Sequence, residues 1–186
     1  MQIIEQLVIG KSNQRQCEDG IAVSDGFVAV IDGSTSKTKR RINPDLTNGK
    51  YCTELVSDFI VSMPKNISLD EFCDGVTALI DSKYEHFNVN MEFLRRHSEN
   101  RLTASAVIYS SHLRQIWMVG DCQCLVNGIL YENSKPQEAI AADKRSRFLK
   151  EKLSLGVSVD EIQIHDIGRD QILVNLVQDM ARQNID

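Results

Sequence analysis

At 186 residues, with 42% hydrophobic and 25% charged side chains, the chain has the length and composition of a single globular domain with its own hydrophobic core. Its formal net charge of −5 argues against nucleic acid or an anionic membrane as the main partner. Because no apolar run approaches the roughly 18 residues of a membrane span, and the first residues lack the basic start of a signal peptide, we expect a cytoplasmic protein without a membrane partner.

The first predicted element is a β-hairpin over residues 20–31. Two apolar runs flank Asp25-Gly26, which is the strongest short-range signal for a hairpin turn. If Asp25 and Gly26 are the two loop residues, the strand register places Asp19 opposite Asp32. Opposed carboxylates with Cβ atoms about 4.5–5.5 Å apart repel each other unless a cation lies between them. The hairpin therefore predicts a divalent-cation site with oxygen ligands, and the alternative interpretation is a solvated acidic turn.

Two helices follow this hairpin. Apolar residues recur at helical spacing over residues 48–63, and Pro64 ends the pattern. A capping box at residues 68–71 opens a second helix, whose apolar face runs to Phe87 and whose pattern extends toward Arg96. We expect the two helices to form an antiparallel layer over a sheet.

A second hairpin is predicted from two β-rich runs, residues 103–109 and 115–119, joined by a short polar loop. It ends in Gly120-Asp121, and an extended pattern resumes over residues 122–126. This Gly-Asp pair at the end of a buried strand resembles the placement of Asp32-Gly33 after the first hairpin. The chain therefore places acidic residues at strand ends twice.

The last third of the chain predicts two more helices. Pro136 suits the first turn of a helix that ends near Leu153, and apolar residues at helical spacing indicate another helix over residues 170–182. Because no linker, repeat or low-complexity tract interrupts the sequence, we interpret residues 1–186 as a single domain or as the front part of a longer one.

The order of these motifs resembles the type-2C, metal-dependent protein phosphatases. In that family an arginine precedes Glu-Asp, a strand ends in Asp-Gly, another strand contains Thr-Ala, and a later strand ends in Gly-Asp. The resemblance implies an α+β fold, a four-layer α-β-β-α sandwich that is incomplete here at its carboxyl-terminal end. It also implies a two-metal centre with Mg²⁺ or Mn²⁺. The matching residues are Arg15, Glu18-Asp19, Asp32-Gly33, Thr103-Ala104 and Gly120-Asp121, within residues 8–127.

The resemblance also implies a role for each matching residue. Asp19 and Asp32 correspond to carboxylates that bridge or flank the two metal ions, and Gly33 corresponds to a ligand that binds through its backbone carbonyl. Glu18 corresponds to an acid that orients metal-bound water, and Asp121 corresponds to a carboxylate that helps to hold a further, weaker metal. The expected reaction is hydrolysis of phosphoserine or phosphothreonine, in a phosphorylated protein or a small phosphate ester, by a metal-bridging water.

Two departures from the family pattern lie near this centre. Arg15 is the candidate phosphate-binding residue, because a guanidinium fork fits phosphate oxygens. It lies three residues before Glu18, where the family usually has four, so Lys11 or the basic run 37–41 could take this role. That run is either a solvated loop or a lip that attracts phosphate. Ser34 stands where animal and plant members often have a histidine, which indicates a bacterial-type site.

The most serious departure is at the carboxyl-terminal end. The family supplies further metal-binding aspartates from late strands, in a Ser-Asp-Gly motif and a final Asp-Asn motif. The Ser-Asp-Gly of this chain, residues 24–26, is the predicted hairpin turn, and no acid ends an apolar strand after Asp121. Three alternatives stay open: an active phosphatase, a catalytically inactive pseudophosphatase or regulatory module of the same fold, and a fragment of a longer phosphatase. An amino-terminal-nucleophile amidase would need Thr, Ser or Cys at a processed terminus, and Met1-Gln2 offers none.

Overall fold

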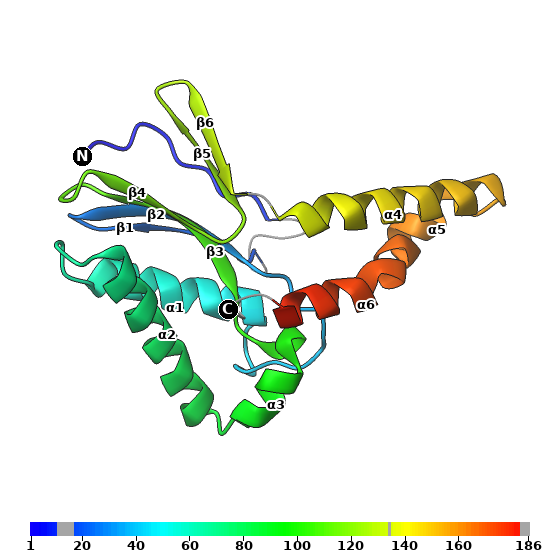
Figure 1. The fold of residues 1–186 in the computed structure, drawn as a ribbon, viewed down its shortest axis with the longest axis horizontal. Coiled ribbons are helices and arrows are strands. Elements are labelled where there is room, and N and C mark those ends of the chain that lie inside the picture. Colours follow the sequence, from blue (N-terminus) through cyan, green and yellow to red (C-terminus); the bar gives the residue numbers. More distant parts are fainter. Residues whose placement is uncertain (11–16, 134, 183–186) are drawn as a thin grey trace.

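The computed structural model describes residues 1–10, 17–133 and 135–182 (Figure 1). It is an α+β fold, in which a four-stranded antiparallel sheet has the order β1-β2-β3-β4 and a separate two-stranded sheet pairs β5 with β6. The strands are β1 (Asp19–Val23), β2 (Phe27–Gly33), β3 (Ala104–Ser110), β4 (Gln115–Val119), β5 (Cys122–Val126) and β6 (Ile129–Asn133). The helices are α1 (Asn48–Ser62), α2 (Leu69–His86), α3 (Met91–Arg96), α4 (Pro136–Ser154), α5 (Val159–Ile164) and α6 (Ile167–Arg182), with a short 3-10 helix, η2 (Ser98–Asn100). Among the helices described, none is long and apolar enough to cross a membrane.

The first hairpin has the predicted turn and the predicted register. The backbone N–H of Ser24 donates to the carbonyl of Phe27 at 2.9 Å across the Asp25-Gly26 turn. From this turn the two strands pair residue by residue as far as Asp19, which lies opposite Asp32. The expectation from the two-residue loop is therefore confirmed.

The helices α1 and α2 cover one face of the four-stranded sheet (Figure 1). Alternate residues of β2 on this face are buried, beginning with Phe27, and the ring of Phe27 lies 5.8 Å from that of Trp117 on β4. Phe72 of α2 reaches the same tryptophan, with ring centroids 5.9 Å apart. The hydrophobic core therefore lies between the sheet and this helical layer, as the sequence predicted.

The opposite face of the sheet also carries apolar side chains. Because successive residues of a strand point to opposite faces, the register assigns to this face every second residue of β1 to β4. Three of the apolar side chains on this face are exposed, namely Val23, Val30 and Ile116. The same face also carries Ile21, Val28, Val107, Tyr109 and Met118.

The second helix is shorter than its predicted extension toward Arg96. Its capping box is present as expected. The side chain of Ser68 accepts a hydrogen bond from the N–H of Glu71, and the side chain of Glu71 accepts one from the N–H of Ser68. The helix ends at His86 because Asn88 adopts a left-handed conformation with φ of 52°, a conformation that ends helices. Asn90 then caps α3 as a separate helix, accepting a hydrogen bond from the N–H of Phe93. The extension through Arg96 was therefore wrong.

The helix α4 extends away from the sheet, and α6 runs back along α4 toward η2 (Figure 1). Pro136 lies in the first turn of α4, as predicted, and α6 begins at Ile167, a few residues before its predicted start. The two helices pack against each other, and Arg145 of α4 bonds Asp166 at 2.6 Å. The sequence analysis predicted neither β6 nor α5.

Candidate functional site

Asp19 and Asp32 lie side by side at the end of the first hairpin that is remote from its turn. Asp19 is half-buried, and its Oδ2 accepts a weak hydrogen bond from Cys17 Sγ at 3.7 Å, whereas Asp32 is exposed. Both residues border one cavity of about 260 Å³. The cavity is also lined by Leu7, Val8 and Ile9 of the amino-terminal segment and by the strand residues Gly20, Val30 and Ile31.

Gly33 packs against α1 at the end of β2. A Cβ atom on Gly33 would clash with the backbone oxygen of Gly49 and would lie 2.6 Å from both the backbone oxygen of Glu18 and Oγ1 of Thr53. The same Glu18 oxygen accepts hydrogen bonds from Thr53 Oγ1 at 2.6 Å and from the N–H of Gly33 at 3.3 Å. This contact fixes β1, β2 and α1 relative to one another where the carboxylates of Asp19 and Asp32 leave the sheet.

Glu18 and Asp19 are neighbours in sequence, but their side chains lie in different surroundings. Glu18 Oε1 lies 2.8 Å from the position that a Cβ on Gly49 would occupy, in the first turn of α1. A carboxylate is stabilised there by the partial positive charge of the helix amino terminus. The structure therefore places the Glu18 carboxylate at the start of α1 and not among the described residues that line the cavity, and its role in orienting water stays a prediction.

Asp121 reaches the same end of the sheet through Ser105. The β2–β3 register pairs Ser105 with Asp32, and Ser105 Oγ donates to Asp121 Oδ1 at 2.5 Å. Gly120 makes this approach possible, because it has φ of +78° and its missing Cβ would lie 2.5 Å from Ser105 Oγ. Asp19, Asp32, Ser105 and Asp121 therefore form one polar row across the sheet.

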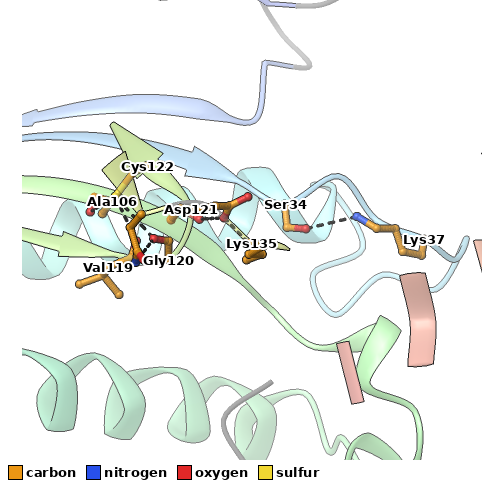
Figure 2. Close-up of polar contacts among 10 residues, drawn as sticks. Ser34, Lys37, Ala106, Val119, Gly120, Asp121, Cys122 and Lys135 are labelled. Atoms are coloured by element: carbon orange, nitrogen blue, oxygen red, sulfur yellow. Dashed lines mark hydrogen bonds and ion pairs between the residues drawn. The ribbon is translucent and has the colours of Figure 1, made fainter. Parts of the chain in front are cut away.

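Lys135 binds the same carboxylate oxygen of Asp121 as Ser105 does. Its Nζ donates to Asp121 Oδ1 at 2.7 Å (Figure 2). Burial alone would raise the pKa of Asp121, but the hydrogen bonds from Lys135 and Ser105 outweigh burial and lower this pKa to about 2. Glu138 also lies against Asp121, since burial and a hydrogen bond to Asp121 raise the pKa of Glu138. The sequence analysis identified neither Lys135 nor Glu138.

Lys37, in the basic run 37–41, contacts residues that directly follow β2. Lys37 Nζ donates to the backbone oxygen of Thr35 at 2.8 Å and contacts Ser34 Oγ at 3.5 Å (Figure 2). Its positive charge also acts on Glu138, whose pKa it lowers in part. Arg40 instead stacks on the ring of Phe93, 4.3 Å from its centroid. The candidate phosphate ligand Arg15, and Lys11, lie outside the described residues.

No family model matches the chain, and comparisons with curated proteins and with solved structures gave no significant match. The candidate site therefore has to be evaluated from its own donor atoms.

Two opposed carboxylates are ligands of the kind that Mg²⁺ and Mn²⁺ bind. Within the part of the chain that the structure describes, no group of three or more His, Cys, Asp and Glu side chains is placed to hold a metal ion. Mg²⁺, however, keeps several of its waters and is usually bound by only one or two carboxylates. Asp19 and Asp32 supply these two carboxylates beside a cavity, and the backbone carbonyl of Gly33 as a further ligand stays a prediction. The donor set therefore fits a hydrated divalent cation.

Proposed function

We propose that the chain is a metal-dependent phosphatase-like protein of the type-2C kind, acting on phosphoserine, phosphothreonine or a small phosphate ester. The observation that carries the proposal is the register of the first hairpin, which puts Asp19 opposite Asp32 beside a cavity. The resemblance of the motifs to the family supplies the reaction. A divalent cation bound there would lower the pKa of a water molecule and neutralise charge on the phosphoryl oxygens.

The residues at this end of the first hairpin have distinct parts in this proposal. Asp19 and Asp32 would hold the cation through their carboxylates, and the packing of Gly33 on α1 would keep them in register. Lys37, on the loop after β2, would attract the phosphate group, because a positive charge beside a binding site raises the local concentration of anions. Glu18, at the start of α1, would orient water from the side of the helix.

The open face of the sheet supports the proposed sandwich. In a four-layer α-β-β-α fold, the sheet face opposite the helices packs on a second sheet, and such an inner face is apolar. Here that face carries apolar residues on every strand, including the exposed Val23, Val30 and Ile116. We therefore propose that residues 17–133 supply one helical layer and one sheet of this sandwich.

A second candidate function is a non-catalytic regulatory module of the same fold. The observation that favours it is the bond between Lys135 and Asp121. In the described structure this carboxylate is already bonded to an ammonium group and a hydroxyl group. A phosphatase centre that needs Asp121 for a further metal would be weakened by this arrangement.

The two candidates differ in their turnover of p-nitrophenyl phosphate with Mn²⁺. We expect turnover close to the metal-only background, because among the described residues only two strand carboxylates border the cavity, and Asp121 is bonded to Lys135. Any turnover above background should disappear in Asp32→Asn and survive in Asp25→Asn, which removes the same charge in the hairpin turn. Rapid turnover that depends on Asp32 would exclude the regulatory module, and turnover that persists in Asp32→Asn would contradict the proposed site.

A further inference from the structure

We propose that Lys135 is an internal counter-cation of the candidate metal site, which positions Asp121 and competes with a divalent cation for its carboxylate. This inference rests on the proposed function, because it concerns the same polar row at the end of the sheet. It adds a residue that the motifs do not contain and a property, control of metal affinity, that they do not imply.

The last residue of β6 and the residue before α4 each bind one residue of the Gly120-Asp121 pair. Asn133, at the end of β6, donates from Nδ2 to the backbone oxygen of Gly120 at 2.7 Å. Lys135 donates to Asp121 Oδ1 at 2.7 Å, and Ser105 donates to the same oxygen. One oxygen of the Asp121 carboxylate is thus bonded both by Ser105 of β3 and by Lys135, which precedes α4.

The position of Lys135 in its own helix does not explain a lysine there. Lys135 is the N-cap residue of α4, and its side chain makes no capping hydrogen bond. Ser, Thr, Asp and Asn are preferred at this position, and a cation is disfavoured near the positive end of the helix dipole. A residue that is unfavourable for its own helix is expected where it has a function elsewhere. Here the bond to Asp121 explains why a lysine occupies the N-cap position.

The ion pair is placed where a dissolved cation can reach it. The side chains of Lys135 and Asp121 are 34% and 32% exposed, so neither is sealed in the core. Glu138, in the first turn of α4, also interacts with Asp121. Removal of the ammonium group would leave two adjoining carboxylates, which is an arrangement that favours a divalent cation.

The test compares Mn²⁺ affinities, measured by isothermal titration calorimetry on the full chain. We expect Lys135→Met to bind Mn²⁺ about tenfold more tightly than the wild type, because the positive charge that is paired with the Asp121 carboxylate is removed. Lys135→Arg keeps the charge and should stay within about twofold of the wild type. Lys144→Met is the matched control, since it removes an exposed lysine from the same helix. An affinity of Lys135→Met equal to that of the wild type, or an equal gain in Lys144→Met, would overturn the inference.

A second pair of variants separates this inference from the proposed function. Asp32→Asn is titrated with Mn²⁺ both alone and combined with Lys135→Met. If Asp32→Asn abolishes Mn²⁺ binding but Lys135→Met binds Mn²⁺ no more tightly than the wild type, the cation site stands and the role of Lys135 is wrong. If Asp32→Asn changes nothing while Lys135→Met still gains affinity, the inference stands and the proposed site fails. If no variant binds Mn²⁺, both fail. Lys135→Gln replaces the methionine variant if that protein does not fold.

Discussion

Mn²⁺ at one hundred times its dissociation constant is expected to raise the melting temperature of the wild-type chain by about 5–10 °C and to leave Asp32→Asn unchanged. A ligand that binds only the folded state at this excess stabilises it by about 2.7 kcal/mol. In a domain of this length, each kcal/mol shifts the melting temperature by about 2–4 °C. Asparagine keeps the size of the side chain but removes the charge that would hold the cation. The measurement is a thermal melt of both proteins, with chelator and with metal.

The matched control for this experiment is Asp25→Asn. Asp25 lies in the turn of the same hairpin, and its side chain is 91% exposed, with Lys65 at 3.5 Å. An exposed pair of this kind contributes little to stability, so its loss should leave the response to Mn²⁺ intact. Equal responses in the wild type, Asp25→Asn and Asp32→Asn would show that Glu18-Asp19 and Asp32 form a solvated acidic turn instead of a cation site.

The arrangement of Asp19 and Asp32 could be predicted from sequence because local rules determine it. A two-residue Asp25-Gly26 turn fixes which residues face each other, and the alternation of apolar residues on either side excludes a shift by one residue. The register that starts at this turn then places Asp19 opposite Asp32 at the far end of the two strands. No contact distant in sequence was needed for this part of the site.

The elements that the sequence analysis missed also had local signals. Asn127-Gly128 forms the turn between β5 and β6, with φ of 51° and 81°, and Asn-Gly is a strong hairpin signal. Ser158 and Glu161 form a capping box at the start of α5. Both elements are short and largely exposed, so the apolar periodicity on which the analysis relied was weak in them.

The bond between Lys135 and Asp121 is of a different kind, because it could not be read from local patterns. The β5–β6 hairpin brings the start of α4 back to the end of β4, where Asn133 holds Gly120. Without that hairpin, the sequence gives no reason to pair a lysine with an acid fourteen residues earlier. Contacts that depend on the placement of a whole element therefore required the structure.

Gly33→Ala is expected to destabilise the fold by about 3 kcal/mol and to lower the melting temperature by roughly 6–12 °C. The added Cβ would meet backbone oxygens of Gly49 and Glu18, together with Thr53 Oγ1. The two backbone atoms belong to α1 and to the residue before β1, so neither can move aside as a flexible side chain would. Overpacking against a fixed backbone lies at the costly end of such substitutions.

The control for this substitution is Gly128→Ala, in the turn between β5 and β6. Gly128 has φ of +81°, but nothing lies within 4 Å of its missing Cβ. Alanine there should cost only the strain of a left-handed backbone, about 1–2 kcal/mol, and should keep the response to Mn²⁺. Gly33→Ala should lose that response as well as stability, because α1 can no longer approach the strand ends that carry Asp19 and Asp32. If thermal melts show Gly33→Ala to be the milder change, or to keep the full Mn²⁺ response, then close packing of Gly33 on α1 does not hold the carboxylates in place.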